Sequence, residues 1–107
     1  MDRNTILTGI LQDENITYSF TQVCHTHHIS EDVLIELLEH GLISEVTLPI
    51  KNVAFNPLML NRIQSARRLQ EDLGVNSPGV VLVLELRDEL EKMRNELEIL
   101  RRHIELL

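Results

Sequence analysis

Residues 20 to 44, "FTQVCHTHHISEDVLIELLEHGLIS", predict two short helices joined by a tight turn. Ser19 and Gln22 stand at the spacing of a capping box, which predicts a first helix over roughly residues 21 to 28. Ser30 is the next N-cap candidate, and Gly41 stands where a helix-ending glycine is expected. An apolar stripe runs between those two residues, formed by Val33, Leu34, Leu37 and Leu38. Two helices this close together are typical of a helix-turn-helix.

Short β-segments are predicted on both sides of these helices. Residues 16 to 20 alternate apolar and polar side chains, as a half-buried strand does. Residues 45 to 55 resemble a hairpin, with residues 49 to 52 as its turn, and such a hairpin would form a wing beside the helices. Residues 1 to 15 mix polar and apolar side chains and are typical of either a frayed tail or a docked strand.

Two further helices follow the predicted wing. Asn56-Pro57 combines a capping residue with a proline at the first helical position, and Gly74 ends the helix that starts there. Its buried face is expected to contain Met59, Ile63, Ala66, Leu69 and Leu73. Ser77-Pro78 repeats the start signal, and from Val80 to Leu107 neither proline nor glycine interrupts the chain. The last helix is therefore expected to be the longest.

This last helix has an apolar stripe suited to a partner helix. Apolar residues recur at alternating spacings of three and four: Val83, Leu86, Leu90, Met93, Leu97, Leu100, Ile104 and Leu107. Such a repeat over roughly four heptads favours a coiled coil, although packing on the chain's own domain would also use it. Residues 80 to 84 are apolar all round and are expected in the core, while the helix after Glu85 projects outward. We therefore predict a homodimer through the seven stripe residues from Leu86 onward.

Charges flanking the stripe bear on the direction of pairing. With Val83 at heptad position a, the e and g positions are occupied by Arg87, Arg94, Arg101, Glu89, Glu96 and His103. In a parallel dimer Glu89 of one copy would face Arg94 of the other, whereas an antiparallel dimer would bring like charges together. Exposed pairs contribute only ~0.2–1 kcal/mol each, so the charges tilt towards a parallel dimer without deciding it.

The composition excludes several classes of function. The net charge of −7 means that the chain as a whole gains nothing from the counterion release that drives DNA binding. Aromatic residues make up only 3% of the chain, which leaves almost nothing on which single-stranded bases could stack. The single cysteine forms no internal disulfide and fits a reducing cytoplasm, and no stretch has the length of a signal peptide or a membrane span. We therefore expect a cytoplasmic protein.

The second helix of the helix-turn-helix lacks the residues that read DNA. Residues 21 to 50 contain five acidic residues and neither lysine nor arginine, and the nearest cation is Lys51 at the wing turn. A helix that enters a DNA groove needs cationic or amide side chains for phosphates and bases. We therefore do not expect DNA as the partner and predict that a basic protein surface binds Glu31, Asp32, Glu36 and Glu39. The alternative for each of these acids is the solvated face of an amphipathic helix.

Metal binding and catalysis have weaker support. Cys24 and His28 would lie one turn apart on a helix, with His25 and His27 nearby, but only His40 could add a further ligand. Cys24 is better explained as a small buried hydrophobe, and we expect neither a metal nor another cofactor. No nucleophile has an identifiable base, so we expect no enzymatic activity. Arg62, Arg67 and Arg68 form a small basic patch that either pairs within the chain or docks a partner.

Two stretches carry a resemblance to a known family. They are "FTQVCHTHHISEDVLIELLEHGLIS" and "RIQSARRLQEDLGVNSPGVVLVLELRDELEKM", of which the second contains the pattern L..DLG.N..GV.L.L.L.D between Leu69 and Asp88. Over roughly residues 17 to 95 the chain resembles the CbpM family of chaperone modulators, which share the MerR-like layout. The resemblance implies a non-enzymatic bacterial regulator that binds the J-domain of a DnaJ-like co-chaperone, CbpA, and blocks its stimulation of DnaK. It also implies antiparallel pairing of the long helices, in conflict with the flanking charges.

The resulting fold prediction is mainly α: a MerR-like winged helix-turn-helix with a small β-hairpin wing and a long C-terminal dimerisation helix. Residues 1–15 would be a tail, residues 16–75 the winged helix-turn-helix, and residues 76–107 the long helix, packed on the core at its start and coiled-coil-like after about residue 85. The alternative function is a MerR-like transcription regulator that binds DNA. Charge on the second helix of the motif favours the chaperone modulator.

Overall fold

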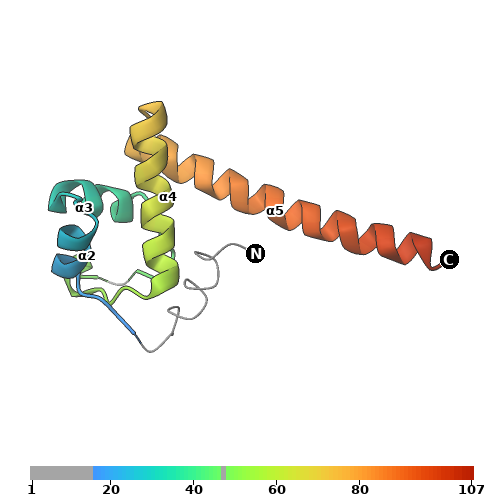
Figure 1. The fold of residues 1–107 in the computed structure, drawn as a ribbon, viewed down its shortest axis with the longest axis horizontal. Coiled ribbons are helices and arrows are strands. Elements are labelled where there is room, and N and C mark those ends of the chain that lie inside the picture. Colours follow the sequence, from blue (N-terminus) through green and yellow to red (C-terminus); the bar gives the residue numbers. More distant parts are fainter. Residues whose placement is uncertain (1–15, 47) are drawn as a thin grey trace.

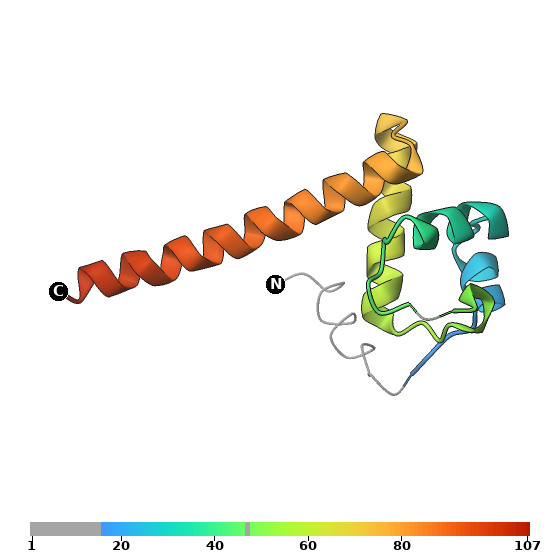
Figure 2. The same cartoon turned by 180° about the vertical axis from the view of Figure 1, so that it is seen from behind.

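The computed structural model describes residues 16–46 and 48–107. Within these residues the chain forms four α-helices and one 3-10 helix: α2 (Phe20–Thr26), α3 (Glu31–Glu39), η1 (Ile50–Asn52), α4 (Pro57–Leu73) and α5 (Ser77–Glu105). Helices α2, α3 and α4 and the start of α5 pack together, while the rest of α5 extends away from them (Figures 1 and 2). The predicted mainly α fold with a long C-terminal helix is confirmed.

The predicted capping residues start three of the helices. Ser19 and Gln22 form the reciprocal capping box of α2, with Gln22 N–H donating to Ser19 Oγ over 3.1 Å. Ser30 accepts from the Val33 amide at the start of α3, and Asn56 caps α4 with proline at its first turn. Side-chain oxygens thus satisfy amides that have no partner within the helix.

Two helix ends differ from the sequence prediction. Helix α2 stops at Thr26 rather than at residue 28, because His28 adopts a positive φ of 52° and turns the chain into α3. The N-cap of α5 is Asn76, whose side-chain oxygen accepts from the Gly79 amide over 2.8 Å. Ser77 is instead the first helical residue and is buried, with its hydroxyl oxygen accepting from Gln70 over 3.3 Å. Asparagine serves as well as serine at this position, so the prediction was wrong by one residue.

The core lies where α2, α3 and α4 meet the first two turns of α5. Its fully buried large side chains are Phe55, Leu34, Leu37, Leu42, Ile63, Val23 and Val80. In α4, Ile63 and Ala66 are buried as predicted and Met59 and Leu69 are partly buried against the core, but Leu73 is 66% exposed. Leu73 is the last residue of α4 and lies on its exposed side. The described part of the chain contains no helix long and apolar enough to cross a membrane.

The hairpin predicted for residues 45 to 55 is not found among the described residues. The chain there forms η1, whose turn is closed by the Asn52 amide donating to the Pro49 carbonyl over 3.0 Å, after a cis Leu48-Pro49 peptide. The backbone of Phe55 pairs with Tyr18, with 2.8 Å hydrogen bonds in both directions. Both backbone groups of Phe55 bond Tyr18, and its side chain fills the core, so Phe55 does not pair with Val46 or Leu48. The strand predicted for residues 16 to 20 is reduced to this bridge.

Helix α5 changes character along its length. Val80, Val81 and Leu84 are buried against α3 and α4, whereas Leu82 is 55% exposed, so residues 80 to 84 are not buried all round as predicted. Beyond Leu84 every residue of α5 is exposed, and the helix continues outward as a single rod (Figure 1). Leu84 is thus the last buried residue of α5.

Candidate interaction surfaces

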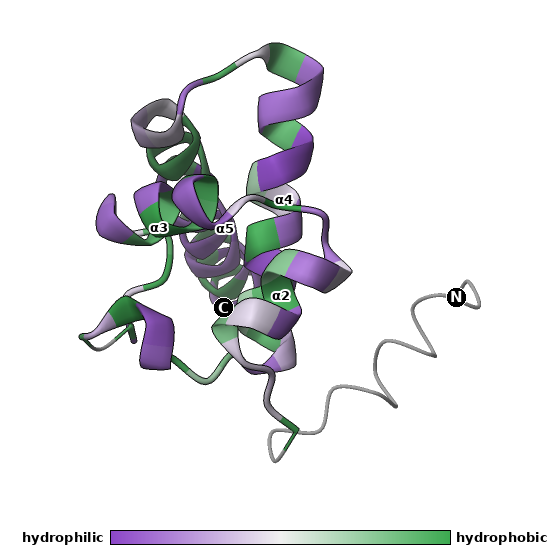
Figure 3. Ribbon diagram, turned by 90° about the vertical axis from the view of Figure 1, so that its left-hand side faces the viewer, coloured by the Kyte–Doolittle hydropathy of each residue, from purple (hydrophilic) through white to green (hydrophobic). Residues whose placement is uncertain are grey.

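The predicted acidic residues of α3 share one solvent-facing side of the helix. Asp32, Glu36 and Glu39 follow one another at spacings of four and three residues, which places them on neighbouring turns of one face, and Glu31 adjoins them. All four are exposed, while the opposite face is buried through Leu34, Leu37 and Leu38. The ribbon of α3 accordingly shows both hydrophilic and hydrophobic residues (Figure 3). The structure therefore brings the four candidate residues together as a single surface, called the acidic α3 face below.

One end of the acidic α3 face contacts Lys51, the nearest cationic residue in the sequence. Lys51 Nζ of η1 lies 3.7 Å from Glu31 Oε2, and both side chains are more than half exposed, so the pair is weak. Among the ion pairs of the described residues, none involves Asp32, Glu36 or Glu39. These three carboxylates therefore face solvent without a compensating charge from the described part of their own chain.

The stripe of α5 is exposed along the whole projecting part of the helix. The exposed fractions of its side chains lie between 48% for Leu90 and 98% for Leu107, and the exposed set comprises Leu86, Leu90, Met93, Leu97, Leu100, Ile104 and Leu107. A continuous apolar strip of this length is rare on a free monomer surface and marks an interaction surface. Six of the seven residues predicted for dimerisation thus lie along one face of α5, Leu107 follows the end of the helix, and all seven are exposed in the described part of the chain.

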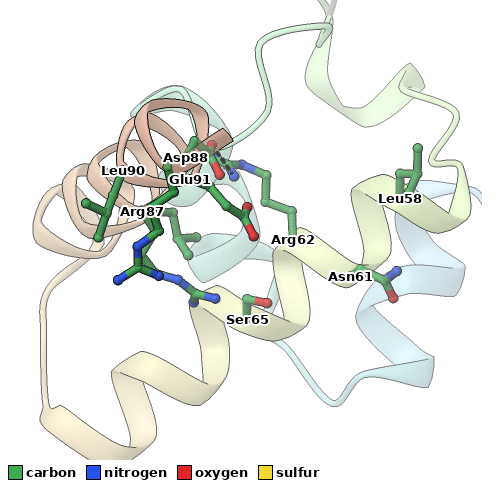
Figure 4. A pocket seen from close by; sticks show the side chains of 10 residues that line it. Leu58, Asn61, Arg62, Ser65, Arg87, Asp88, Leu90 and Glu91 are labelled. Atoms are coloured by element: carbon green, nitrogen blue, oxygen red, sulfur yellow. Dashed lines mark ion pairs between the residues drawn. The ribbon is translucent and has the colours of Figure 1, made fainter. Parts of the chain in front are cut away.

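A groove between α4 and α5 was not predicted from the sequence. It encloses ~480 Å³ and is lined from α4 by Leu58, Asn61, Arg62 and Ser65, and from α5 by Leu84, Arg87, Asp88, Leu90, Glu91 and Arg94 (Figure 4). The four α4 residues repeat at spacings of three, one and three, which is the pattern of a single helix face. That pattern was visible in the sequence, but only the crossing of α4 over α5 makes it one wall of a groove.

Arg62 joins three parts of the fold. Its Nη1 lies 2.8 Å from Asp88 Oδ2 of α5, and its Nε donates to the carbonyl oxygen of Leu42, just after α3. Arg67 instead contacts Gln70 and Glu71 on its own helix at 3.4 and 3.5 Å. The sequence left open whether the basic patch pairs within the chain or docks a partner; Arg62 and Arg67 pair within the chain, and Arg68 is exposed.

The cysteine and histidine residues around α2 do not form the arrangement considered from the sequence. Because α2 ends before His28, Cys24 and His28 are not neighbours on successive helical turns. The described residues contain no group of three or more His, Cys, Asp or Glu side chains placed to hold a metal ion. Partial burial, and secondarily the charge of Glu31, raises the pKa of the Cys24 thiol, which disfavours the thiolate that binds metals.

His27 is held by a neighbour on α4. Its Nδ1 lies 3.2 Å from Gln64 Nε2, so the amide donates to the ring nitrogen when the imidazole is neutral with its proton on Nε2. Burial, and secondarily the neighbouring His28, lowers the pKa of His27 below its usual 6.5. The contact therefore ties α2 to α4 through a neutral histidine, which is a structural role.

Comparison with known proteins agrees with this layout. The model of the family described as MerR HTH family regulatory protein matches residues 18–102. The chain is 27% identical over 88 residues to the chaperone modulatory protein CbpM of Coxiella burnetii, covering 82% of this chain and 83% of that protein. It is 28% identical over 79 residues to the protein of the same name from Salmonella arizonae, covering 74% and 78% of the two chains. Because the family model covers most of its length, the chain belongs to the MerR HTH family of regulatory proteins.

Proposed function

We propose that this chain is a chaperone modulator that binds the J-domain of a DnaJ-like, CbpA-type co-chaperone and inhibits its stimulation of DnaK. The observation that carries the proposal is the acidic α3 face, in a chain similar over 82% of its length to a protein named chaperone modulatory protein. The helix has the position of a DNA-recognition helix but presents carboxylates only. Such a surface is complementary to a Lys/Arg-rich helix of the kind by which J-domains contact DnaK.

The chemistry of the acidic α3 face suits a transient, competitive contact. Exposed carboxylates steer a basic partner over roughly one Debye length, ~8 Å at physiological salt, and raise the association rate more than the final affinity. An inhibitor that covers the basic helix of the J-domain makes the charges that DnaK would contact inaccessible. We therefore expect binding of the J-domain to weaken strongly as the salt concentration rises.

DNA binding has less support than protein binding. In the major groove of DNA, Asp32, Glu36 and Glu39 would lie near the phosphates. No lysine or arginine lies between residues 21 and 50 to offset their negative charge. Lys51, the nearest cation, already lies beside Glu31. A groove contact by this helix would therefore be repulsive, whereas a basic protein surface would gain from the same charges.

We also propose that two copies pair through the exposed stripe of α5. Leu97 and Leu100 are 55% and 60% exposed in the single chain, and burying the exposed part of each contributes roughly half of the ~1.5–3 kcal/mol of a fully exposed leucine. Seven of them in heptad spacing give a partner helix a continuous seam. A dimer would contain two acidic α3 faces and could hold two J-domains.

One titration tests the function directly. The isolated J-domain of the co-chaperone encoded in the same genome is titrated into the purified protein by calorimetry, with duplex DNA titrated in parallel at low salt. We expect saturable binding of the J-domain and suppression of its stimulation of DnaK ATPase activity, without saturable DNA binding. Saturable binding of DNA together with no heat from the J-domain would reject the proposal in favour of a transcription regulator.

A further inference from the structure

A polar pocket of ~290 Å³ lies between the end of α2 and the second half of α4. It is lined by His27, the C-cap residue of α2, and by Gln64, Arg67, Arg68 and Glu71 of α4. None of these five side chains is apolar, whereas three leucines line the groove between α4 and α5. An apolar occupant would leave the polar groups of this pocket without water or another partner. The pocket therefore suits a small polar ligand.

The lining of this pocket has an excess of positive charge. Two arginines, Arg67 and Arg68, are accompanied by one carboxylate, that of Glu71, and by the neutral His27. Among the described residues, Arg68 belongs to no ion pair. Because the chain as a whole has a net charge of −7, this positive excess is a local feature of the surface. The pocket therefore favours a negatively charged ligand.

The contact between Arg67 and Glu71 leaves room for another anion. Arg67 Nη2 lies 3.5 Å from Glu71 Oε1, and Arg67 Nη1 lies 3.4 Å from Gln70 Oε1, so both contacts are at the long limit for hydrogen bonds. The side chain of Glu71 is 67% exposed, and water screens its attraction to the arginine. An oxyanion with shorter hydrogen bonds can therefore replace Glu71 as the partner of Arg67.

The contact between Gln64 and His27 adds a donor to the lining. Gln64 Nε2 donates to His27 Nδ1 over 3.2 Å, so the neutral ring has its proton on Nε2. The same contact holds the half-buried ring against α4. The pocket thus combines an N–H donor from the end of α2 with two guanidinium groups from α4.

We propose that this pocket binds a small phosphate-bearing ligand, whose oxygens accept hydrogen bonds from His27, Arg67 and Arg68. A planar guanidinium offers paired N–H donors that match two oxygens of a phosphate. The volume of the pocket is several times the ~30 Å³ that one water molecule occupies in the liquid, which is enough for a phosphate group and a few attached atoms. The site rests neither on the proposed J-domain partner nor on the proposed dimer.

A bound phosphate would join the end of α2 to α4. His27 lies directly before the turn at His28 that leads into α3, so the ligand would support the helix-turn-helix from behind that turn. A ligand that binds the folded chain and not the unfolded chain stabilises the fold in proportion to its saturation. We therefore expect phosphate to raise the melting temperature as well as to bind.

Titration with inorganic phosphate, with ionic strength held constant by sodium chloride, tests the proposal by NMR of the histidine rings. The resonances of His27 should shift along a saturation curve with a dissociation constant of ~1 mM, while those of His103 on α5 should not shift. Arg68→Gln should raise that dissociation constant at least ~5-fold. Arg101→Gln removes the same charge at an exposed position of α5 and should leave the constant unchanged. Arg68 is exposed and belongs to no ion pair of the described residues, so its variant is expected to fold.

Thermal unfolding provides a second readout. Phosphate also stabilises proteins by its exclusion from their surface, but that effect rises steadily with concentration and is shared by all variants. The saturable part of the increase in melting temperature, at least ~3 °C, should be present in the unaltered protein and in Arg101→Gln and lost in Arg68→Gln.

Three results would overturn the proposal. The first is the absence of a shift of His27 at ~50 mM phosphate, which is far above the expected dissociation constant. The second is an equal dissociation constant for Arg68→Gln and the unaltered protein. The third is a shift of His27 by duplex DNA at phosphate-group concentrations at which inorganic phosphate has no effect, since the pocket would then bind the nucleic-acid backbone and not a small ligand.

Discussion

The guanidinium of Arg62 and the carboxylate of Asp88, 2.8 Å apart, join the middle of α4 to the point where α5 leaves the core. Arg62 is also the donor to the carbonyl oxygen of Leu42, so one side chain connects α4, α5 and the segment after α3. Its side chain is 26% exposed, whereas that of Asp88 is 61% exposed. This polar contact lies beside Leu84, the last buried residue of the helix, where α5 leaves the core.

Substitution of Arg62 should destabilise the fold more than substitution of Asp88. Arg62→Ala removes both the ion pair and the donor to Leu42, and we expect a loss of ~1–2 kcal/mol in the free energy of unfolding by urea. Asp88→Asn removes only a solvent-screened charge, and its cost should stay below ~1 kcal/mol. Arg102→Ala, which removes the exposed pair with Glu98, serves as a control with no measurable effect. Equal losses for Arg62→Ala and Arg102→Ala would show that the contact does not support the fold.

Charge reversal on the acidic α3 face should weaken J-domain binding without unfolding the chain. The double variant Glu36→Lys, Glu39→Lys reverses two exposed carboxylates opposite the buried stripe, and we expect at least ~10-fold weaker binding in calorimetry. Glu45→Lys, Asp72→Lys carries the same change in net charge at exposed positions outside α3 and should bind nearly normally. An identical loss in both variants would assign the effect to net charge alone, and no loss in either would remove α3 from the interface.

Local sequence signals predicted most of the helical layout. Ser19, Ser30 and Asn56 are caps in the structure because capping depends on neighbouring residues only. The wing prediction failed for the opposite reason: whether Phe55 pairs with a neighbour in sequence or with Tyr18 depends on tertiary packing. The positive φ of His28, which shortens α2, has no sequence signal as strong as glycine.

The candidate surfaces also differ in how far the sequence predicts them. The acidic α3 face and the stripe of α5 are periodic along single helices, and their exposure follows the sequence pattern. The groove depends on how α4 crosses α5, and the internal pairing of Arg62 with Asp88 joins residues 26 positions apart in the chain. Contacts between helices cannot be derived from spacing within each helix, so the groove is visible only in the structure.

Disruption of the α5 stripe should give a folded monomer. Leu97→Asp places a charge in the middle of the seam, at a side chain that is 55% exposed in the single chain and makes no contribution to the core. We expect the molecular mass from light scattering to halve at tens of micromolar, with helical content largely retained. Asn95→Asp adds the same charge on the outer side of α5 and should remain dimeric. A dimer that survives Leu97→Asp would locate the self-association elsewhere.

Protonation of His27 should destabilise the contact between α2 and α4. The pKa of His27 is lowered in the folded protein, so the stabilising neutral form is present above the unfolded value of 6.5 and is lost as pH falls through the folded pKa. A protonated ring carries a proton on Nδ1 and can no longer accept from the Gln64 amide. We therefore expect the free energy of unfolding to decrease as pH falls from 7 towards 5, and His27→Gln to reduce that decrease. His25→Gln, at an exposed position of α2, is the matched control, and an equal pH dependence in both variants would contradict the assignment to His27.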